Sequence, residues 1–239
     1  MNPGSGPAAD QVTLLPRTVS SGSRARILDL FCGAGGAGMG YHRAGFEVVG
    51  VDIEPQPNYP FEFIQGDALD WASWHVEAAE FDAIHASPPC PRFSLVSGFH
   101  GVAEKHPDLL GPVRAQLDRA PTPYVIENVP GAPMRRDVVL CGEMFGLRVH
   151  RHRWFECRGV FVMAQPHTRH RLKGAATNCE QGDGIARWIT GNYANYEDAA
   201  DAMGVDWPMA RRELANAIPP AYTEHIGGYL MAEINAKAA

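Results

Sequence analysis

A cysteine held between prolines is the residue of this sequence with the clearest chemical potential. Residues 87–94 read SPPCPRFS, so prolines directly precede and follow Cys90. Proline fixes the backbone φ angle, which suits a nucleophile that must point in one direction. A thiolate attacks electron-poor carbon and forms reversible adducts. A single cysteine is more often a small buried apolar residue, so a nucleophilic role for Cys90 depends on its surroundings.

A glutamate supplies the second candidate group. Glu127 begins the sequence ENVP near the end of an apolar run at 124–129. If that run and the run at 81–86 are parallel strands, their carboxyl ends meet at one edge of the sheet, and Glu127 lies beside Cys90. A carboxyl group whose pKa is raised in a cleft can protonate a ring nitrogen while a thiolate attacks the ring. The alternative is a glutamate that only supports its neighbours or caps a helix.

Three other apolar runs end in residues suited to a nucleotide. The run at 27–31 leads into five glycines at 33–40, which let the backbone and the N–H groups of a following helix approach a ligand. Asp52 lies about 20 residues farther on, where a carboxylate can accept hydrogen bonds from ribose hydroxyls. Asp67 ends the third run and could accept from an adenine amino group or cap the next helix. Glycines also serve turns and helix packing, but together these strand ends favour an adenosine-containing cofactor.

Alternating strands and helices must position these groups. Apolar runs predict strands at 27–31, 46–53, 61–64, 81–86, 124–129 and 138–141, and helical patterns lie at 39–44, 69–76 and 109–119. Repeated strand–helix units of this length predict an α/β protein with a parallel sheet and helices on both faces. A further helix follows Pro219 and Pro220 and runs through Ile234.

Composition and pattern set the domain organisation. The 239 residues, 45% apolar and 20% charged, fit one full domain and a smaller unit. We predict four segments: a disordered tail at 1–22, a catalytic region at 23–156, a small insert at 157–210 with a helix near 196–203, and a C-terminal segment at 211–239 that returns to the catalytic region.

The same composition narrows the cellular setting. No apolar run approaches the roughly 18 residues of a membrane span, and residues 1–22 lack the pattern of a secretory leader. The five cysteines are widely spaced and form no CxxC pair, so reduced thiols are expected. We therefore predict a soluble cytoplasmic protein without membrane contact.

Charge is distributed unevenly along the chain. The net charge of −6 argues weakly against a nucleic-acid partner. Residues 148–173, however, carry seven Lys or Arg against one acid. This stretch is either a solvated surface or a surface for phosphates.

Cysteines and histidines of the insert do not form a familiar metal site. Cys157, His167, His170 and Cys179 have the spacing C-x9-H-x2-H-x8-C, which matches no common zinc pattern. We therefore predict no bound metal, with histidines that face solvent or phosphate. The aromatic residues of the insert could stack on bases or form its core; they include Trp188, Tyr193 and Tyr196.

Taken together, the motifs resemble those of the cytosine-C5 DNA methyltransferases. Five motifs occur in the family's order: DLFCGAGG at 29–36, Pro89-Cys90 with Phe93-Ser94, ENV at 127–129, Arg151-His152-Arg153, and NAIPP at 216–220. They cover roughly residues 26–155 and 211–230. Five motifs in order are far more specific than any single one.

The resemblance implies a Rossmann-like fold of the kind that binds S-adenosylmethionine (SAM), with a mostly parallel, doubly wound sheet and a small recognition insert. The implied catalytic residues are Cys90, which adds to C6 of cytosine, Glu127, which protonates N3, Arg153, which binds the base at O2, and Arg151. The implied cofactor residues are Phe31 on the adenine, Asp52 on the ribose, Asp67 on the adenine amino group, and Gly33, Gly35, Ile53, Pro89 and Asn216. The implied substrate is DNA with a cytosine flipped out of the duplex, as in a compact restriction–modification enzyme of a phage or bacterium.

The sequence departs from the family pattern in three places. Pro91 stands where the family has glutamine, and Ala215 stands where it has glycine. The insert of about 54 residues, 157–210, is shorter than a usual target-recognition domain. Recognition of the target sequence is therefore expected to be short, relaxed or supplied by a partner.

Three alternatives remain open at the level of sequence. The same chemistry could act on RNA or a single strand, because no duplex then has to be opened. A non-catalytic nucleic-acid-binding relative would have no need for Cys90, Glu127 and Arg153. A nicotinamide dehydrogenase would explain the glycines but neither the Pro89-Cys90 motif nor the Glu127 motif.

Overall fold

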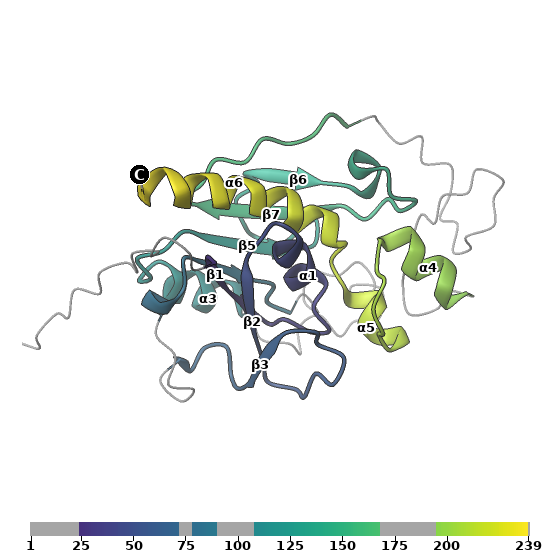
Figure 1. Ribbon diagram of the computed structural model, residues 1–239, viewed down its shortest axis with the longest axis horizontal. Helices are drawn as coiled ribbons and strands as arrows, with labels where there is room; N and C mark the ends of the chain where they lie inside the picture. The colour runs from purple at the N-terminus through teal and green to yellow at the C-terminus, as the bar shows by residue number, and fades with distance from the viewer. Residues whose placement is uncertain (1–23, 72–77, 90–107, 168–194, 239) are drawn as a thin grey trace, which may run out of the picture.

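The computed structural model describes residues 24–71, 78–89, 108–167 and 195–238 (Figure 1). Its centre is a seven-stranded sheet in the order β3-β2-β1-β4-β5-β7-β6. The strands are β1 (Arg26–Leu30), β2 (Glu47–Asp52), β3 (Glu62–Gln65), β4 (Ala83–Ala86), β5 (Tyr124–Asn128), β6 (Val138–Leu140) and β7 (Arg153–Arg158). All six predicted strands are present, with ends shifted by one or two residues.

Strand directions confirm the mostly parallel sheet. β3, β2, β1, β4 and β5 pair in parallel, whereas β7 is antiparallel to both β5 and β6. Sequence patterns missed β7, which continues to Arg158 and so crosses the expected boundary between 156 and 157. Cys157, assigned to the insert, is a buried residue of this strand and of the sheet's core.

Helices cover both faces of the sheet, as Figure 1 shows. The α-helices are α1 (Gly36–Arg43), α3 (Leu110–Leu117), α4 (Tyr196–Met203), α5 (Arg211–Asn216) and α6 (Pro220–Ala238), and the 3-10 helices are η2 (Ala78–Glu80) and η4 (Gly142–Phe145). Alternation along β1 divides the core: Ile27 packs with α1 and α6, whereas Leu28 and Leu30 pack with α3.

The C-terminal helix is packed tightly against α1. A side chain at Gly40 would collide with the backbone of Pro220 and with the hydroxyl of Thr223, so only glycine permits this approach. The Thr223 hydroxyl donates to the Ala37 carbonyl over 2.8 Å. At least one glycine of the cluster therefore serves helix packing, which was the alternative reading of these residues.

Of the remaining predicted segments, one is confirmed and others lie outside the described residues. The helix near 196–203 is confirmed as α4. The tail at 1–22 and most of the expected helix at 69–76 lie outside the described residues. None of the helices within the described ranges combines the length and the apolar character that a membrane crossing requires.

Candidate active site

The glycine loop after β1 has a strained and open backbone. Phe31 has a φ of 59°, a left-handed conformation that is uncommon outside glycine and costs about 1–3 kcal/mol. Gly33 has a φ of 49°, and nothing lies within 4 Å of the position that its side chain would occupy. Strain of this kind persists where surrounding structure demands it, and here it presents bare backbone to open space.

Asp52 fixes this loop from the end of β2. One of its carboxylate oxygens accepts from the Gly33 N–H over 3.0 Å, and the other accepts from the Glu54 N–H over 3.0 Å. The next side chain, Ile53, is 64% exposed although it is large and apolar. A carboxylate beside an uncovered apolar side chain fits the ribose and the flat ring of an adenosine.

The remaining predicted cofactor residues differ in what the structure shows. Gly35 has a φ of 88°, and a side chain there would meet Pro60 at 2.9 Å, so packing requires this glycine. Asp67 accepts from the Leu69 N–H over 2.9 Å, within a turn. Asn216 is the exposed last residue of α5. Direct contacts of Asp67 and Asn216 with a cofactor remain predictions.

The helix that follows the glycine loop begins without a negative group. The first turn of α1 holds no acidic residue, and no side chain caps its N-terminus. The first N–H groups of a helix have no carbonyl partner within the helix, and together with the positive end of the helix dipole they favour an anion at this point. This is compatible with the carboxylate of an amino-acid-bearing nucleoside.

The segment between β4 and Cys90 is hydrogen-bonded to the motif that contains Glu127. Cys90 itself lies outside the described residues, and the described chain stops at the exposed Pro89. The side-chain amide of Asn128 donates to the Pro88 carbonyl over 3.1 Å. Because β4 and β5 are parallel neighbours, the ends of both strands open at the same edge of the sheet.

Glu127 is a buried carboxyl group with an incomplete set of partners. Its side chain is 8% exposed, and Arg153 Nε lies 2.8 Å from Oε1. That contact lacks hydrogen-bond geometry, and Oε1 has no hydrogen-bond partner among the described residues. Burial raises the pKa of Glu127, although Arg153, Arg151 and a hydrogen bond from Ser87 oppose the rise. A carboxyl group in this state can hold a proton and deliver it.

A chain of polar side chains that sequence patterns did not reveal stands behind Glu127. The Tyr41 hydroxyl lies 2.9 Å from Nδ1 of His85, and Nε2 of His85 lies 2.7 Å from the Ser87 hydroxyl. Burial lowers the pKa of His85 to about 3, so the imidazole is neutral and carries one N–H.

The donor and acceptor roles in these hydrogen bonds depend on the Glu127 carboxylate, which can only accept. If Ser87 donates to the Glu127 carboxylate, the interaction that lowers the pKa of Glu127, its oxygen accepts from Nε2–H of His85, and Nδ1 then accepts from Tyr41. Every donor in the chain points toward the carboxylate. No local sequence signal marks His85, since Tyr41 comes from a helix more than forty residues earlier.

The paired arginines join the glutamate to the C-terminal segment. Arg151 donates to the Ala215 carbonyl over 2.6 Å, and the Tyr222 hydroxyl donates to the Arg151 carbonyl over 2.6 Å. A side chain at Gly36 would meet the Ile218 carbonyl at 2.6 Å. The C-terminal segment therefore contacts both Arg151 and the start of α1.

The basic stretch at 148–173 is largely neutralised within the described residues. Arg148 pairs with Asp201 over 2.7 Å, and Arg158 pairs with Asp118 over 2.9 Å. With Arg153 held by Glu127, this part of the stretch is not a uniform phosphate surface. Its other basic residues, Arg169, Arg171 and Lys173, lie outside the described residues.

These features define a fold. A mostly parallel sheet with an antiparallel β7, a glycine loop after β1 and an acid at the end of β2 form the fold of SAM-dependent methyltransferases. Residues 25–140 match the model of the family described as C-5 cytosine-specific DNA methylase.

Curated relatives are bacterial type II methyltransferases. The chain is 32% identical over 123 residues to M.AquIA of Picosynechococcus sp. and 28% identical over 120 residues to M.FnuDI of Fusobacterium nucleatum. The first match covers 44% of this chain and 49% of the relative, and the second covers 47% and 34%. The chain thus spans between a third and a half of these two relatives.

Solved structures share the fold over nearly the whole chain. The Entamoeba histolytica methyltransferase EhMeth has a TM-score of 0.60 and 11% identity, with 89% of this chain and 99% of that chain covered. A prophage-encoded protein of E. coli described as a DNA modification methyltransferase has a TM-score of 0.58 and 15% identity, with 88% and 99% covered. At these identities the comparison establishes the fold.

Proposed function

We propose that this protein transfers a methyl group from SAM to C5 of a cytosine in DNA, through a covalent adduct between Cys90 and C6. The observation that carries this proposal is Glu127, a buried carboxyl group with a raised pKa, held by Arg153 at the end of β5. Glu127 lies at the same edge of the sheet as the end of β4, and the chain continues from the end of β4 to Cys90. The family match of residues 25–140 agrees with this chemistry.

The glycine loop and the end of β2 are suited to hold the cofactor. The open backbone at Gly33, the carboxylate of Asp52 and the uncovered side chain of Ile53 fit an adenosine. The uncapped N-terminus of α1 fits the carboxylate of a methionine group. When bound, SAM supplies a methyl group on a positively charged sulfur.

The side chains of this chain would carry the remaining steps. The thiolate of Cys90 forms a bond to C6 while Glu127 gives its proton to N3, which makes C5 nucleophilic. Arg153 donates to O2 and stabilises the charge that develops on the ring. After the methyl group is in place, C5 loses its proton to a base, the C6–sulfur bond breaks, and the proton on N3 returns to Glu127.

Because Glu127 is buried, the cytosine must enter the protein to reach it. Glu127 lies below the protein surface and cannot reach N3 of a base that is stacked and paired in a duplex. Extruding the base costs a few kcal/mol of stacking and pairing. A flipped cytosine is therefore part of the proposal, and single strands would avoid this cost.

The test is transfer of a labelled methyl group to nucleic acid by the full chain. We expect incorporation into cytosine of duplex DNA, with Cys90→Ala abolishing it and Cys157→Ala, which removes a buried thiol of β7, retaining it. Calorimetry should show SAM affinity unchanged in Cys90→Ala and weakened in Asp52→Ala.

A second arm tests the covalent step and the substrate. Cytosine with fluorine at C5 has no proton to lose there, so the adduct should persist on denaturing gels and be absent in Cys90→Ala. Methylation of RNA in preference to DNA, or turnover in Cys90→Ala, would overturn the proposal.

A further inference from the structure

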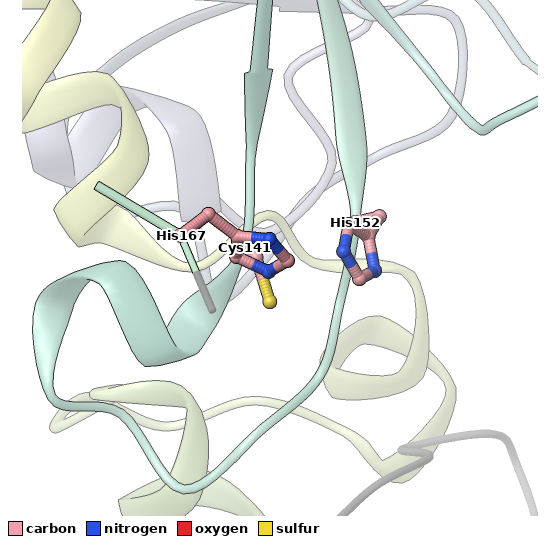
Figure 2. Close-up of side chains that lie close together, drawn as sticks. All are labelled: Cys141, His152 and His167. Atoms are coloured by element: carbon pink, nitrogen blue, oxygen red, sulfur yellow. The ribbon is translucent and has the colours of Figure 1, made fainter. Parts of the chain in front are cut away.

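Three potential metal ligands converge behind the arginine pair. One ligand atom each from Cys141, His152 and His167 lies within 4.8 Å of the others (Figure 2). Cys141 is buried, His152 is partly buried and His167 is exposed. The proposed methyl transfer assigns no role to these side chains.

The sheet register explains how the first two ligands meet. The last pair of the β6–β7 ladder is Leu140 with Arg153, so Cys141 and His152 are the next pair along the two strands. Residues that face each other across an antiparallel pair carry side chains about 4.5–5.5 Å apart at Cβ. Figure 2 shows both side chains at the ends of neighbouring strands.

The third ligand comes from the segment that follows β7. Val162 in this segment is buried with the α1 and α6 side of the core. The Met163 carbonyl accepts from Nε2 of His225 over 2.7 Å, which fastens the segment to α6. His167 then lies edge-on to His152, with ring centres 5.2 Å apart and an angle of 80° between the rings.

The donor set is the one that zinc prefers. Sulfur and imidazole nitrogen bind Zn²⁺ at about 2.3 and 2.0–2.1 Å, which places tetrahedral ligand atoms roughly 3.3–3.8 Å apart. The three atoms here lie within 4.8 Å of one another. They need to close by about 1.5 Å or less to reach that spacing, which side-chain rotation can supply. Hard cations such as Mg²⁺ and Ca²⁺ favour oxygen ligands and do not fit this set.

We propose that Cys141, His152 and His167 bind a zinc ion, with a fourth coordination position open to water. The ion would fasten the segment after β7 to the β6–β7 edge, directly beside Arg151 and Arg153. Binding forms a sulfur–zinc bond and releases the thiol proton to solvent. The set considered from the sequence contains Cys157 and matches no common zinc pattern, and the structure places Cys157 inside β7 and within the core.

Calorimetric titration of the chelator-treated full chain with Zn²⁺ tests the site directly. We expect one ion per chain and a rise in the thermal midpoint on binding. His167→Gln should weaken affinity at least about tenfold, and it should keep the fold because His167 is exposed. His42→Gln, which removes an exposed histidine of α1, is the matched control and should leave binding unchanged.

Cobalt in place of zinc identifies the sulfur ligand. A thiolate bound to Co²⁺ gives a charge-transfer absorption, which should appear in the wild-type chain and in Cys90→Ser but not in Cys141→Ser. Circular dichroism checks that Cys141→Ser is folded. Absence of stoichiometric metal, zinc binding that is unaffected in His167→Gln, or a thiolate band that persists in Cys141→Ser would each overturn the proposal.

Discussion

Two buried glutamates on neighbouring strands have opposite surroundings. Glu127 on β5 and Glu156 on β7 are 6% and 1% exposed. In the ladder between these strands Glu127 pairs with Phe155, and Glu156 pairs with Ile126. Paired residues share a face and successive residues alternate, so the two acids lie one position apart and point to opposite faces of the sheet.

The two carboxyl groups differ in how many of their oxygens have hydrogen-bond partners. Arg114 of α3 donates two hydrogen bonds of 2.9 Å to the two oxygens of Glu156, and the Arg135 N–H adds a third. Glu127 has an ionic contact with Arg153 and leaves Oε1 without a hydrogen-bond partner in the described part of the chain. A carboxylate with all its acceptors engaged stabilises structure, whereas an incompletely satisfied one retains capacity for a proton and a substrate.

The largest expected effect is that of Glu127→Gln on the reaction. Glutamine keeps the size of the side chain but cannot deliver a proton to N3, so the rate of methyl transfer should fall about 10²–10⁴-fold. The free energy of unfolding should change little, because burial already disfavours the ionised carboxylate that the substitution removes. Single-turnover transfer and denaturant unfolding measure the two quantities. An active Glu127→Gln chain would remove the acid from the mechanism.

Glu156→Gln should show the reverse pattern. The substitution breaks the two-pronged contact with Arg114 and leaves buried donors without a charged partner, so the free energy of unfolding should fall by about 1–3 kcal/mol. Arg114 is partly exposed, which keeps the loss moderate. Urea unfolding measures the stability change, and methyl transfer at a temperature where the variant is folded should stay close to wild type. If Glu156→Gln lost transfer while keeping its stability, the assignment of roles to the two acids would be reversed.

The same two acids show how far sequence could lead. Glu127 was found because it ends a run of apolar residues and begins a recognisable motif. Strand β7 was missed because its sequence, RWFECR, carries a glutamate and arginines that resemble a surface segment. Glu156 is buried only because Arg114, 42 residues earlier, reaches it from a helix. Such a long-range partner leaves no local pattern.

The cofactor loop and the metal ligands show the same contrast between residues that local sequence reveals and residues that long-range contacts bring together. The positions of Gly33 and Asp52 followed from strand ends and spacing, and the structure joins them by a hydrogen bond. The pairing of Cys141 with His152 depends on the register of β6 against β7. Since β7 was not predicted, nothing in the sequence grouped Cys141 with His152, and no bound metal was predicted.

Ser87→Ala gives the smallest expected effect and the sharpest test of the polar chain behind Glu127. The Ser87 hydrogen bond lowers the pKa of Glu127, so its removal should raise that pKa further. Because the reaction needs the protonated acid, activity falls as pH rises through this pKa, and the alkaline limb of the kcat profile should move to higher pH. The rate at neutral pH should change by less than about tenfold.

Ser87→Thr is the matched control, since threonine keeps the hydroxyl that accepts from His85 and donates to Glu127. We expect its alkaline limb to coincide with that of the wild-type chain. A limb that shifts equally in Ser87→Ala and Ser87→Thr would indicate a packing effect at this position. A limb that is unmoved in Ser87→Ala would show that the polar chain does not set the protonation of Glu127, leaving Arg153 and burial as its determinants.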